Sequence, residues 1–544
     1  MQVPSEPNII PNELRDIVAA ARPGPNFITH NIKPHSSLNL EAWKYYAPIY
    51  TESDPTLLQQ LIWGFPTGVP DEAILSVPFT NHTSARRHPD IVEQYINKHI
   101  STKALYGPFS VNPLDISIIV SPLQVAFSRS GKPRVVNDLS YGDHSVNESI
   151  SSDWSQYPGY QGDLTLPTSD ILVDAILRVG KDALLWKTDF AAYYKQLNID
   201  LAYLHQLAFA FDNKIYFESR LPFGLRTSCL NAQRVSQAAI KIYNSKSPSF
   251  ATAYVDDCIG CSPSVRAQKD FDLFWEVTEE LGMQKTLEKC QSPSSCVVWT
   301  GLQYDTIHME ISLPNEKKDR IIELLEEWLT KNHSSKSALQ SLLGTLNHAC
   351  SVIIVGRAFS GHIMDLIRAD QFPIHLDQNF KSDVRFWLSF LRDTTVCKSS
   401  FKSPHTLSCD SVLQVAVHRN TFAVRIHDDI GYFKCEYDEN CDPCITYIFA
   451  LWMASMMLAD IANKQWITII VPTVKVLHNI NRARAVTPDL RPMVRQTWWV
   501  QATRDFVIRA KLGQCDRLID RMLRQNVDFT ELTKNTVPDY FKFM

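Results

Sequence analysis

The 544-residue sequence lacks the features of exported, membrane-embedded and disulfide-stabilised proteins. Its start, MQVPSEPNIIPNELRD, does not have the cationic and then apolar order of a signal peptide. The most apolar stretch, residues 449–459, is about half as long as a bilayer-spanning helix. The 12 cysteines follow no regular framework, which is typical of reduced thiols. We therefore expect an intracellular protein of the cytoplasm or nucleus, neither secreted nor bound to a membrane.

The chain also lacks an excess of positive charge, so its net charge of −4 does not by itself indicate nucleic-acid binding. Residues 475–524 differ, because they contain eleven Lys and Arg against four Asp, a balance of +7. Such a segment could follow a phosphate backbone, or it could be the solvated face of ordinary helices. The composition as a whole, 45% hydrophobic and 21% charged, is typical of a globular protein with several packed units.

Apolar patterns between about residues 115 and 315 predict an α+β fold. Runs bounded by Gly and Pro predict strands, and helical spacing predicts helices. Strands are predicted at 183–190, 297–305 and 309–314, and as hairpins at 115–127 with 134–140 and at 205–211 with 214–224. Residues 249–262 predict two short strands about a turn at the acidic pair. The predicted helices lie at 169–180, capped by Ser169 or Asp170, at 227–244, and at 265–282, ended by Gly282. Antiparallel strands with helices on one face are the expected arrangement.

The flanking regions have other patterns. Residues 1–115 are rich in Pro, Asn, His and Ser and predict a partly helical arm packed on later parts of the chain. Helices are predicted at 315–332, capped by Asn315, and from about 335 to 355. Strand patterns return after residue 400, and helices are predicted after them at 445–463 and 485–511.

Three aspartates stand where phosphoryl transfer would need them. Asp189 ends an apolar strand in KTDF, and Asp256 and Asp257 are adjacent in AYVDDCIG. Nucleotidyl transfer uses two Mg²⁺ ions roughly 4 Å apart, held by carboxylates on rigid backbone. A simpler interpretation is that Asp189 caps a helix and that the pair makes a polar turn. The order of strand-Asp, then LPFG, then YVDD within one α+β region favours the metal site.

Several segments in order resemble reverse transcriptases, across roughly residues 116–316: RVVNDLS, KTDFAAYYKQLNI, LPFGLRTSCLNAQ, YVDD, LGMQKTLEKC, WTGLQYD and ISLPNEK. Three more are similar to DIRS-like (tyrosine-recombinase) retrotransposon reverse transcriptase/ribonuclease H polyproteins: NHTSARRHPDIVEQYI, DLSYGDHSVNESI and SLLGTLNHACSVIIVGRAF. The resemblance implies an RNA-directed DNA polymerase that also copies DNA, with a template, a primer and dNTPs as partners. It implies two Mg²⁺ ions as cofactor, with Mn²⁺ as a substitute.

The resemblance also implies the domain order, a right-hand polymerase (fingers, palm, thumb) followed by a ribonuclease H-like α/β domain. The implied divisions are an N-terminal arm at 1–115, fingers and palm at 116–315, thumb and connection at 316–400, a degenerate ribonuclease H-like domain at 401–530 and a tail at 531–544.

The same resemblance implies the roles of single residues. Asp189, Asp256 and Asp257 would be the catalytic acids and metal ligands, and Lys289 the general acid for pyrophosphate. The implied nucleotide contacts are Arg134 and Lys132 (with Arg129 near the same hairpin tip), the Phe190 carbonyl, Tyr194 beneath the sugar, and Phe223, Gly224 and Gln233 nearby. A bulky ring at 194 would clash with a 2′-OH, which disfavours RNA synthesis. For Tyr194 and Phe223, ordinary core packing is the alternative.

The ribonuclease H-like region departs from the family pattern. Asp410 and Asp520 match two of the four expected acids, but Phe449 and Pro472 stand where the other two should be. Two remaining acids would not hold two Mg²⁺ ions, so we expect no ribonuclease H activity.

A second function class stays open, in which the same fold is a non-catalytic nucleic-acid-binding scaffold adopted by a host. The natural template and primer, the oligomeric state and the retroelement clade cannot be deduced from the sequence. Zinc is disfavoured at Cys258 and Cys261, which have no second pair nearby, and at Cys435, Cys441, Cys444 and His427, whose spacing is irregular.

Overall fold

The computed structural model describes residues 34–70, 80–114, 117–128, 131–142, 145–157, 160, 164–369, 372–393, 397–401, 413–426, 429–459, 466–483, 485, 487, 490–504, 506–513 and 530–532. The chain forms two compact units. Unit 1 consists of Met1–Pro167 and Leu184–Ser294, and unit 2 of Thr168–Ala183 and Ser295–Met544. Residues 168–183 and 295–315 therefore cluster with unit 2, and the finer division predicted from the sequence stays a prediction.

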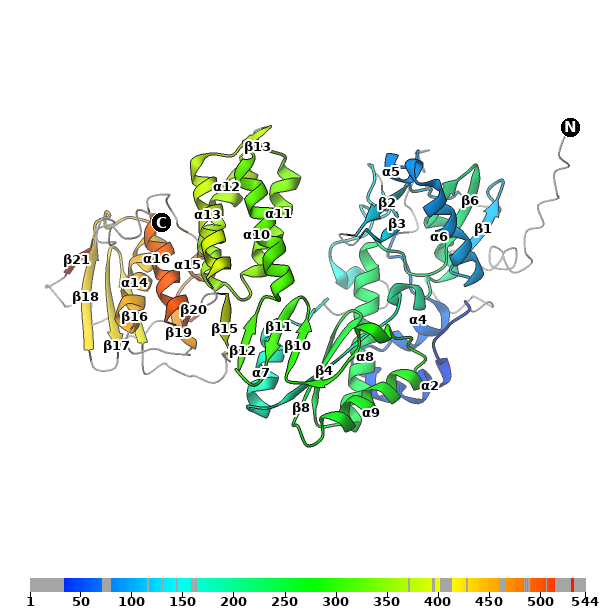
Figure 1. Ribbon diagram of the computed structural model, residues 1–544, viewed down its shortest axis with the longest axis horizontal. Helices are drawn as coiled ribbons and strands as arrows, with labels where there is room; N and C mark the ends of the chain where they lie inside the picture. Colours follow the sequence, from blue (N-terminus) through cyan, green and yellow to red (C-terminus); the bar gives the residue numbers. More distant parts are fainter. Residues whose placement is uncertain are drawn as a thin grey trace, which may run out of the picture. The chain divides into compact units, whose positions relative to one another are not determined.

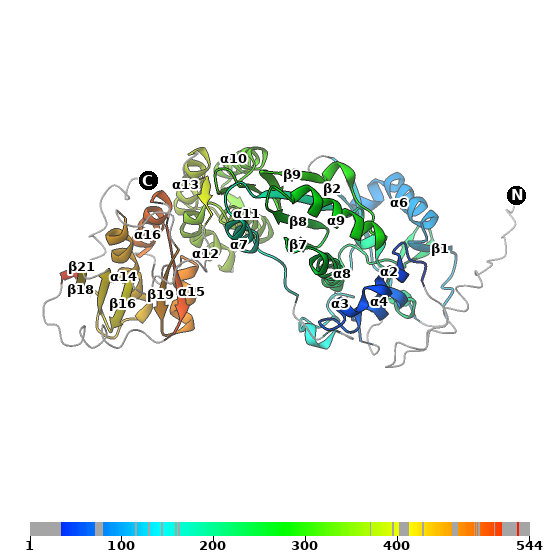
Figure 2. The ribbon, with the colours of Figure 1, turned by 90° about the horizontal axis from the view of Figure 1, so that it is seen from below.

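Unit 1 is built on a four-stranded sheet in the order β7-β8-β4-β9. Its strands are β4 (Leu184–Asp189), β7 (Phe250–Tyr254), β8 (Asp257–Ser262) and β9 (Gln291–Ser294). All three pairings are antiparallel. Helices α8 (Arg226–Lys246) and α9 (Ala267–Glu280) pack against this sheet (Figure 2). The predicted α+β class is confirmed.

The core between sheet and helices is aromatic. Trp186 on β4 lies with its ring centroid 4.9 Å from Phe274 of α9 and 5.7 Å from Tyr243 of α8. Successive side chains of a strand point to opposite faces of the sheet, so alternate residues of β4 pack in this core and the others face away from it. Gly260, in C-I-G-C, is required by this packing, because a Cβ there would lie 2.0 Å from the Trp186 ring. The sheet end that carries the acids is thus fixed by a well-packed core.

The rest of unit 1 surrounds this sheet. A hairpin joins β2 (Leu123–Phe127) to β3 (Pro133–Asn137), and a second sheet has the order β1-β6-β5. Its strands are β1 (Leu105–Phe109), β5 (Ala208–Phe211) and β6 (Lys214–Glu218). The helices of the N-terminal part are α2 (Leu40–Tyr45), α3 (Ala47–Tyr50), α4 (Leu57–Trp63), α5 (Thr83–Arg87) and α6 (Pro89–Ser101).

The predicted packing of the arm on later residues is seen directly. The Trp43 indole donates to the Leu281 carbonyl at 3.1 Å, at the end of α9. Buried Arg234 of α8 pairs with Asp54 at 2.7 Å. Trp43, Tyr50 and Leu57 belong to the same hydrophobic cluster as Trp186. Residues 34–70 are therefore part of the core of unit 1.

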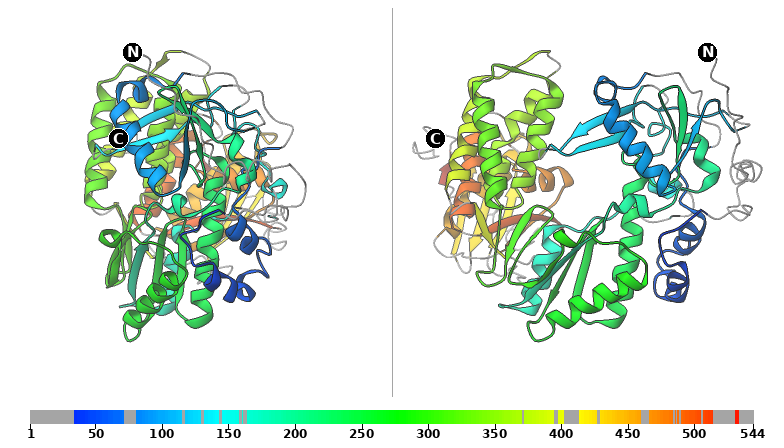
Figure 3. Two further views of the ribbon diagram at one scale, coloured as in Figure 1. Left: turned by 90° about the vertical axis from the view of Figure 1, so that its right-hand side faces the viewer. Right: turned by 45° about the vertical axis from the view of Figure 1, so that its right-hand side comes forward.

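Unit 2 begins with helix α7 (Ser169–Val179) and a sheet in the order β10-β11-β12-β15. These strands are β10 (Cys296–Trp299), β11 (Leu302–Asp305), β12 (Glu310–Ser312) and β15 (Lys398–Ser400). Helices α10 (Asn315–Thr330), α11 (Lys336–Ala349), α12 (Gly361–Arg368) and α13 (Gln378–Arg392) lie alongside one another in both Figure 1 and Figure 3. Short strands β13 (His333–Ser334) and β14 (Ile374–His375) pair at one end of this bundle.

The C-terminal part of unit 2 is a second α/β assembly. Strands β16 (Leu413–His418), β17 (Thr421–Ile426) and β18 (Asp429–Cys435) form an antiparallel meander, and β21 (Thr530–Leu532) pairs with β18 in parallel. β19 (Trp466–Val471) pairs in parallel with β20 (Val507–Leu512). The helices are α14 (Pro443–Leu458), which contacts β16 and β17, α15 (Val474–Asn481) and α16 (Arg491–Thr503). No helix in the described part of the chain is both long and apolar enough to cross a membrane.

Some local predictions are wrong. The helix expected at 485–511 ends at Thr503, and Val507–Leu512 is strand β20, whose buried apolar residues pair with β19. The strand expected at 115–127 is limited to Leu123–Phe127, because Pro122 has no N–H to donate to a ladder. The N-cap of α7 is Thr168, one residue before Ser169 and two before Asp170, and the N-cap of α10 is Pro314, one residue before Asn315. The hairpins at β2–β3, β5–β6 and β7–β8, and the stop at Gly282, are confirmed.

Candidate active site

The three aspartates meet at one end of the unit 1 sheet. In the pairing of β4 with β8, Asp189 lies directly opposite Asp257. The N–H of the next residue, Phe190, donates to the carbonyl of Asp256 at 3.1 Å. The Asp189 carbonyl accepts from the Thr286 N–H at 2.8 Å, which fixes the strand end from its other side. Strand register therefore brings the acids together from two distant parts of the sequence.

The turn that carries Asp256 is a tight two-residue connection between Tyr254 and Asp257, which pair across it. Val255 has a φ of +55°, which is costly for a β-branched residue. The turn is held by Gln233 of α8, whose side-chain oxygen accepts from the Val255 N–H at 2.7 Å and whose amide donates to the Ala253 carbonyl at 2.9 Å. Ser236 Oγ donates to the Val255 carbonyl.

Charge at this sheet end is partly compensated by two lysines. Like charges directly opposite each other on paired strands are destabilising. Lys187 Nζ lies 3.1 Å from an oxygen of Asp257, and Lys289 Nζ lies 3.1 Å from both oxygens of Asp189. Asp189 itself is only 6% exposed. The two lysines offset two of the three carboxylates.

Asp256 has no ion pair in the part of the chain that the structure describes. Burial raises the pKa of its carboxyl group, and the nearby charge of Asp189 raises it further, whereas a backbone hydrogen bond and the charges of Lys289 and Lys187 lower it by less than burial raises it. Because two lysines face three carboxylates, the cluster keeps a net negative charge.

The donor set fits a hard divalent cation, since carboxylate oxygens are the ligands that Mg²⁺ prefers. The backbone adds another candidate donor. The bridge between Phe190 and Lys285 uses the N–H and C=O groups of the flanking residues, so this pairing does not involve the Phe190 carbonyl. Among the described residues no three Asp, Glu, His or Cys side chains are already arranged around one metal position.

Tyr194 and Phe223 lie together beside the acids. Their ring centroids are 5.0 Å apart, and Tyr194 is partly buried in the short 3-10 helix Tyr193–Gln196. Burial raises the pKa of Tyr194, and the charge of Asp256 contributes to the increase. Phe223 is 47% exposed. An exposed aromatic ring backed by a second ring is a surface on which a flat ligand can rest.

Gly224, the residue after Phe223, has a φ of +94°, a backbone conformation that favours glycine. A Cβ there would lie 3.3 Å from the Asn137 carbonyl. Asn147 Nδ2 donates to the Gly224 carbonyl at 2.6 Å, and its oxygen accepts from the Arg226 N–H at 2.8 Å. The L-P-F-G segment is therefore clamped between β3 and the start of α8.

Arg134 and Lys132 lie on the β2–β3 hairpin, both exposed, with Arg134 opposite Ala126. Arg129 lies outside the described residues. The hairpin agrees with the sequence-based prediction, and its two described cations are accessible to an anionic ligand.

The side chain of Gln233 is engaged in contacts within the protein. It is 2% exposed, and both ends of its amide are used by the backbone of the turn. Sequence reasoning missed this bracing role, and it missed Lys187 and Asn147 altogether. The signal for Lys187 is its position two residues before Asp189, which puts both side chains on one face of the strand.

The acid-depleted region of unit 2 is described only in part. Phe449 is fully buried in α14, its ring centroid 6.1 Å from that of Tyr437, and Pro472 directly follows β19. Asp410 and Asp520 lie outside the described residues, as does His427. Cys258 and Cys261 are buried within β8 and form no disulfide, as expected of packed residues.

No family model and no curated protein matches the sequence. Three solved structures are similar in fold, all of foamy viral protease-reverse transcriptase and each 15% identical to this chain. One is a dRH form with ds DNA, with a TM-score of 0.49 over 95% of this chain and 84% of that one. The complex with RNA/DNA hybrid has a TM-score of 0.48 over 97% and 66%, and the complex with dsDNA has 0.47 over 94% and 100%. At this sequence identity and these TM-scores, the structural similarity supports no statement about function. A proposal on function must rest on the side chains of this chain.

Proposed function

We propose that the chain is a DNA polymerase that copies RNA and DNA templates, adding deoxynucleotides to a primer. One observation carries this proposal: Asp189 and Asp257 stand opposite each other on paired strands, with Asp256 in the braced turn beside them. A rigid sheet end with three carboxylates and net negative charge suits the transfer of nucleotides. The substrates are a primed template and dNTPs. The DIRS-like retroelement subgroup is part of the same proposal and rests on sequence segments alone.

Mg²⁺ is the proposed cofactor, with Mn²⁺ as a substitute. Asp189 and Asp256 would be the main ligands, supported by Asp257 and the Phe190 carbonyl. When bound, two such ions would lower the pKa of the primer hydroxyl and stabilise the phosphate charge.

The residues of this chain then have distinct tasks. Arg134 and Lys132 hold the triphosphate, and a guanidinium can do so in bidentate fashion. The Tyr194 and Phe223 rings lie beneath the sugar and exclude a 2′-OH, while Gly224 lets the backbone approach the nucleotide. Gln233 acts as a positioning residue through the turn.

Lys289 would donate a proton to the pyrophosphate leaving group. Its side chain is 59% exposed although its Nζ pairs with Asp189, so the ammonium group stays in contact with solvent when it moves from the acid to a bound phosphate.

Primer extension tests the proposal directly. The wild-type chain should extend oligo(dT) on poly(rA) with dTTP and Mg²⁺. The Asp256→Asn variant should give no product, and a cooperative thermal unfolding transition should show that this variant is folded. A second substrate with a DNA template tests copying of DNA. Absence of product from the wild type in both Mg²⁺ and Mn²⁺ would refute the polymerase.

We further propose that the C-terminal part of unit 2 has no ribonuclease H activity. A fully buried phenylalanine and a proline occupy the positions expected to hold acids. An end-labelled RNA strand in an RNA/DNA hybrid should survive prolonged incubation with the protein and Mg²⁺.

A non-catalytic nucleic-acid scaffold is the second candidate. It is favoured by the lysine pairs, which neutralise two of the three acids without any metal ion. Under this alternative the protein would bind a primed template but give no extension, so the first experiment separates the two candidates.

A further inference from the structure

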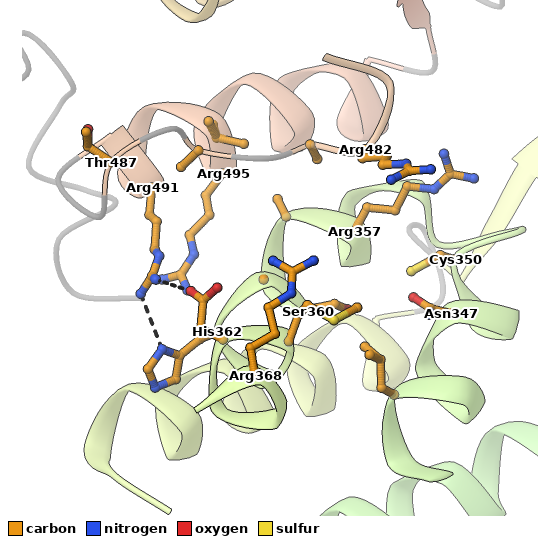
Figure 4. A pocket seen from close by; sticks show the side chains of 18 residues that line it. Asn347, Cys350, Arg357, Ser360, His362, Arg368, Arg482, Thr487, Arg491 and Arg495 are labelled. Atoms are coloured by element: carbon orange, nitrogen blue, oxygen red, sulfur yellow. Dashed lines mark hydrogen bonds and ion pairs between the residues drawn. The ribbon is translucent and has the colours of Figure 1, made fainter. Parts of the chain in front are cut away.

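Unit 2 contains a pocket of about 580 Å³ between helices α11, α12 and α16 and residues 482, 483, 485 and 487 (Figure 4). This volume is in the range of sites for small organic ligands. Five arginines line it: Arg357, Arg368, Arg482, Arg491 and Arg495. Asp365 is the one carboxylate among the described lining residues. The lining therefore carries a large positive excess.

Two of these arginines are held in ion pairs. Arg491 Nη2 lies 2.6 Å from an Asp365 oxygen, and its other terminal nitrogen is 3.4 Å from Nδ1 of His362. His362 in turn lies 2.8 Å from Asp377 through Nε2. Arg495 pairs with the fully buried Asp383 of α13. These pairs tie α16 to α12 and α13 and so give the pocket a fixed wall.

The other three arginines have no carboxylate partner among the described residues. Arg357 donates only to a neutral group, the Asn481 carbonyl, at 3.2 Å. Arg368 and Arg482 are exposed, so their guanidinium groups can reach a ligand in the pocket. Figure 4 shows Arg357 and Arg482 close to each other, with Arg368 pointing between them and Arg491. Three uncompensated cations around one volume create a positive potential.

The charge of Arg357 also acts on a buried neighbour, Arg509. The pKa of Arg509 is lowered to about 9, first by burial and then by the charge of Arg357. An anion near Arg357 would relieve this repulsion. The walls also include apolar side chains, namely Leu343, Ala358, Met364 and Val494, which suit the uncharged part of an organic molecule.

We propose that this pocket binds a small molecule that carries two or more phosphate groups. Guanidinium groups match phosphate oxygens in bidentate geometry, and three of them require more than one phosphate charge. The arginines come from several elements that converge on one pocket, which suits a compact ligand better than the extended backbone of a nucleic acid. The proposal does not depend on the polymerase function, because every residue involved lies in unit 2.

Inorganic tripolyphosphate is the probe for the test, titrated calorimetrically into the full-length chain at fixed ionic strength. The double variant R368Q/R482Q removes two unpaired cations without touching the ion pairs of α16. The matched control is R385Q, an exposed arginine on α13 that does not line the pocket. A DNA oligonucleotide is titrated in parallel.

The expected result is one tripolyphosphate bound per chain, with orthophosphate much weaker. The affinity should fall roughly tenfold or more for each guanidinium lost, and remain unchanged in R385Q. Equal affinity in the double variant and in R385Q, or no binding, overturns the proposal. So does a double variant that loses only the oligonucleotide, since that result would assign the arginines to nucleic-acid backbone instead.

Discussion

At the end of β4 in unit 1 an aspartate faces another aspartate across the sheet, whereas in unit 2 the end of β19 leads into Pro472 and helix α14 buries Phe449. Both regions offer rigid elements on which acids could stand. In the first region, Lys187 and Lys289 supply counter-charges at 3.1 Å. In the second, an aromatic ring fills the space. A buried acid persists where cations offset its desolvation, and an apolar residue packs where nothing does.

The largest expected difference between the two regions should appear when one acid is removed from each. Asp189→Asn should lower primer extension roughly 10³-fold or more, because a neutral amide cannot offer carboxylate charge to a divalent cation. Asp410→Asn should change neither extension nor the integrity of the RNA in a hybrid. Loss of hybrid cleavage in Asp410→Asn would mean that the second region had been active.

Returning an acid to the second region should damage the fold. Phe449→Glu should reduce the free energy of unfolding by about 3 kcal/mol or more, since it replaces a fully buried ring by a charge without a partner. Met456→Glu is the matched control, because Met456 is 36% exposed on the same helix. Urea denaturation of both variants measures the difference, and equal losses would contradict the packing described for Phe449.

The aromatic floor beside the unit 1 acids can be tested by its effect on sugar selection. Tyr194→Ala should raise the ratio of ribonucleotide to deoxynucleotide incorporation on the order of tenfold, since it opens space for a 2′-OH. Tyr194→Phe keeps the ring and should leave the ratio unchanged. Steady-state incorporation of UTP and dTTP gives both ratios. A ratio unchanged in Tyr194→Ala would limit Tyr194 to packing against Phe223.

The smallest expected effect concerns the charge of Asp256 without divalent cations. Its pKa is raised in the folded state, so its contribution to stability is fully present below the unfolded value of 3.8 and is lost as pH rises through the folded pKa. Asp256→Asn should therefore melt slightly higher than the wild type at pH 7 in EDTA, and the difference should shrink at acidic pH. Mg²⁺ should stabilise the wild type more than the variant. If the wild type instead melts at a higher temperature than Asp256→Asn at pH 7 in EDTA, the ionised Asp256 carboxylate does not destabilise the fold.

Much of unit 1 is predictable because its signals are local. The turn at YVDD, the hairpin at β2–β3 and the stop at Gly282 each depend on a few adjacent residues whose backbone preferences are strong. The helix expected at 485–511 fails for a different reason. Val507–Leu512 becomes a strand only because β19 is available beside it, and that pairing joins residues about 40 positions apart in the sequence.

In the candidate active site, too, some features follow from the sequence and others only from the tertiary structure. The sequence by itself determined which acids exist, that strands carry them and that two positions of the second region hold Phe449 and Pro472, because those facts depend on residue identity and local propensity. Only the tertiary structure decided that Lys187 and Lys289 offset two acids, that Gln233 braces the turn, and that arginines from separate helices line one pocket. Such partners are set by strand register and helix packing, and neither is encoded in any single segment of the chain.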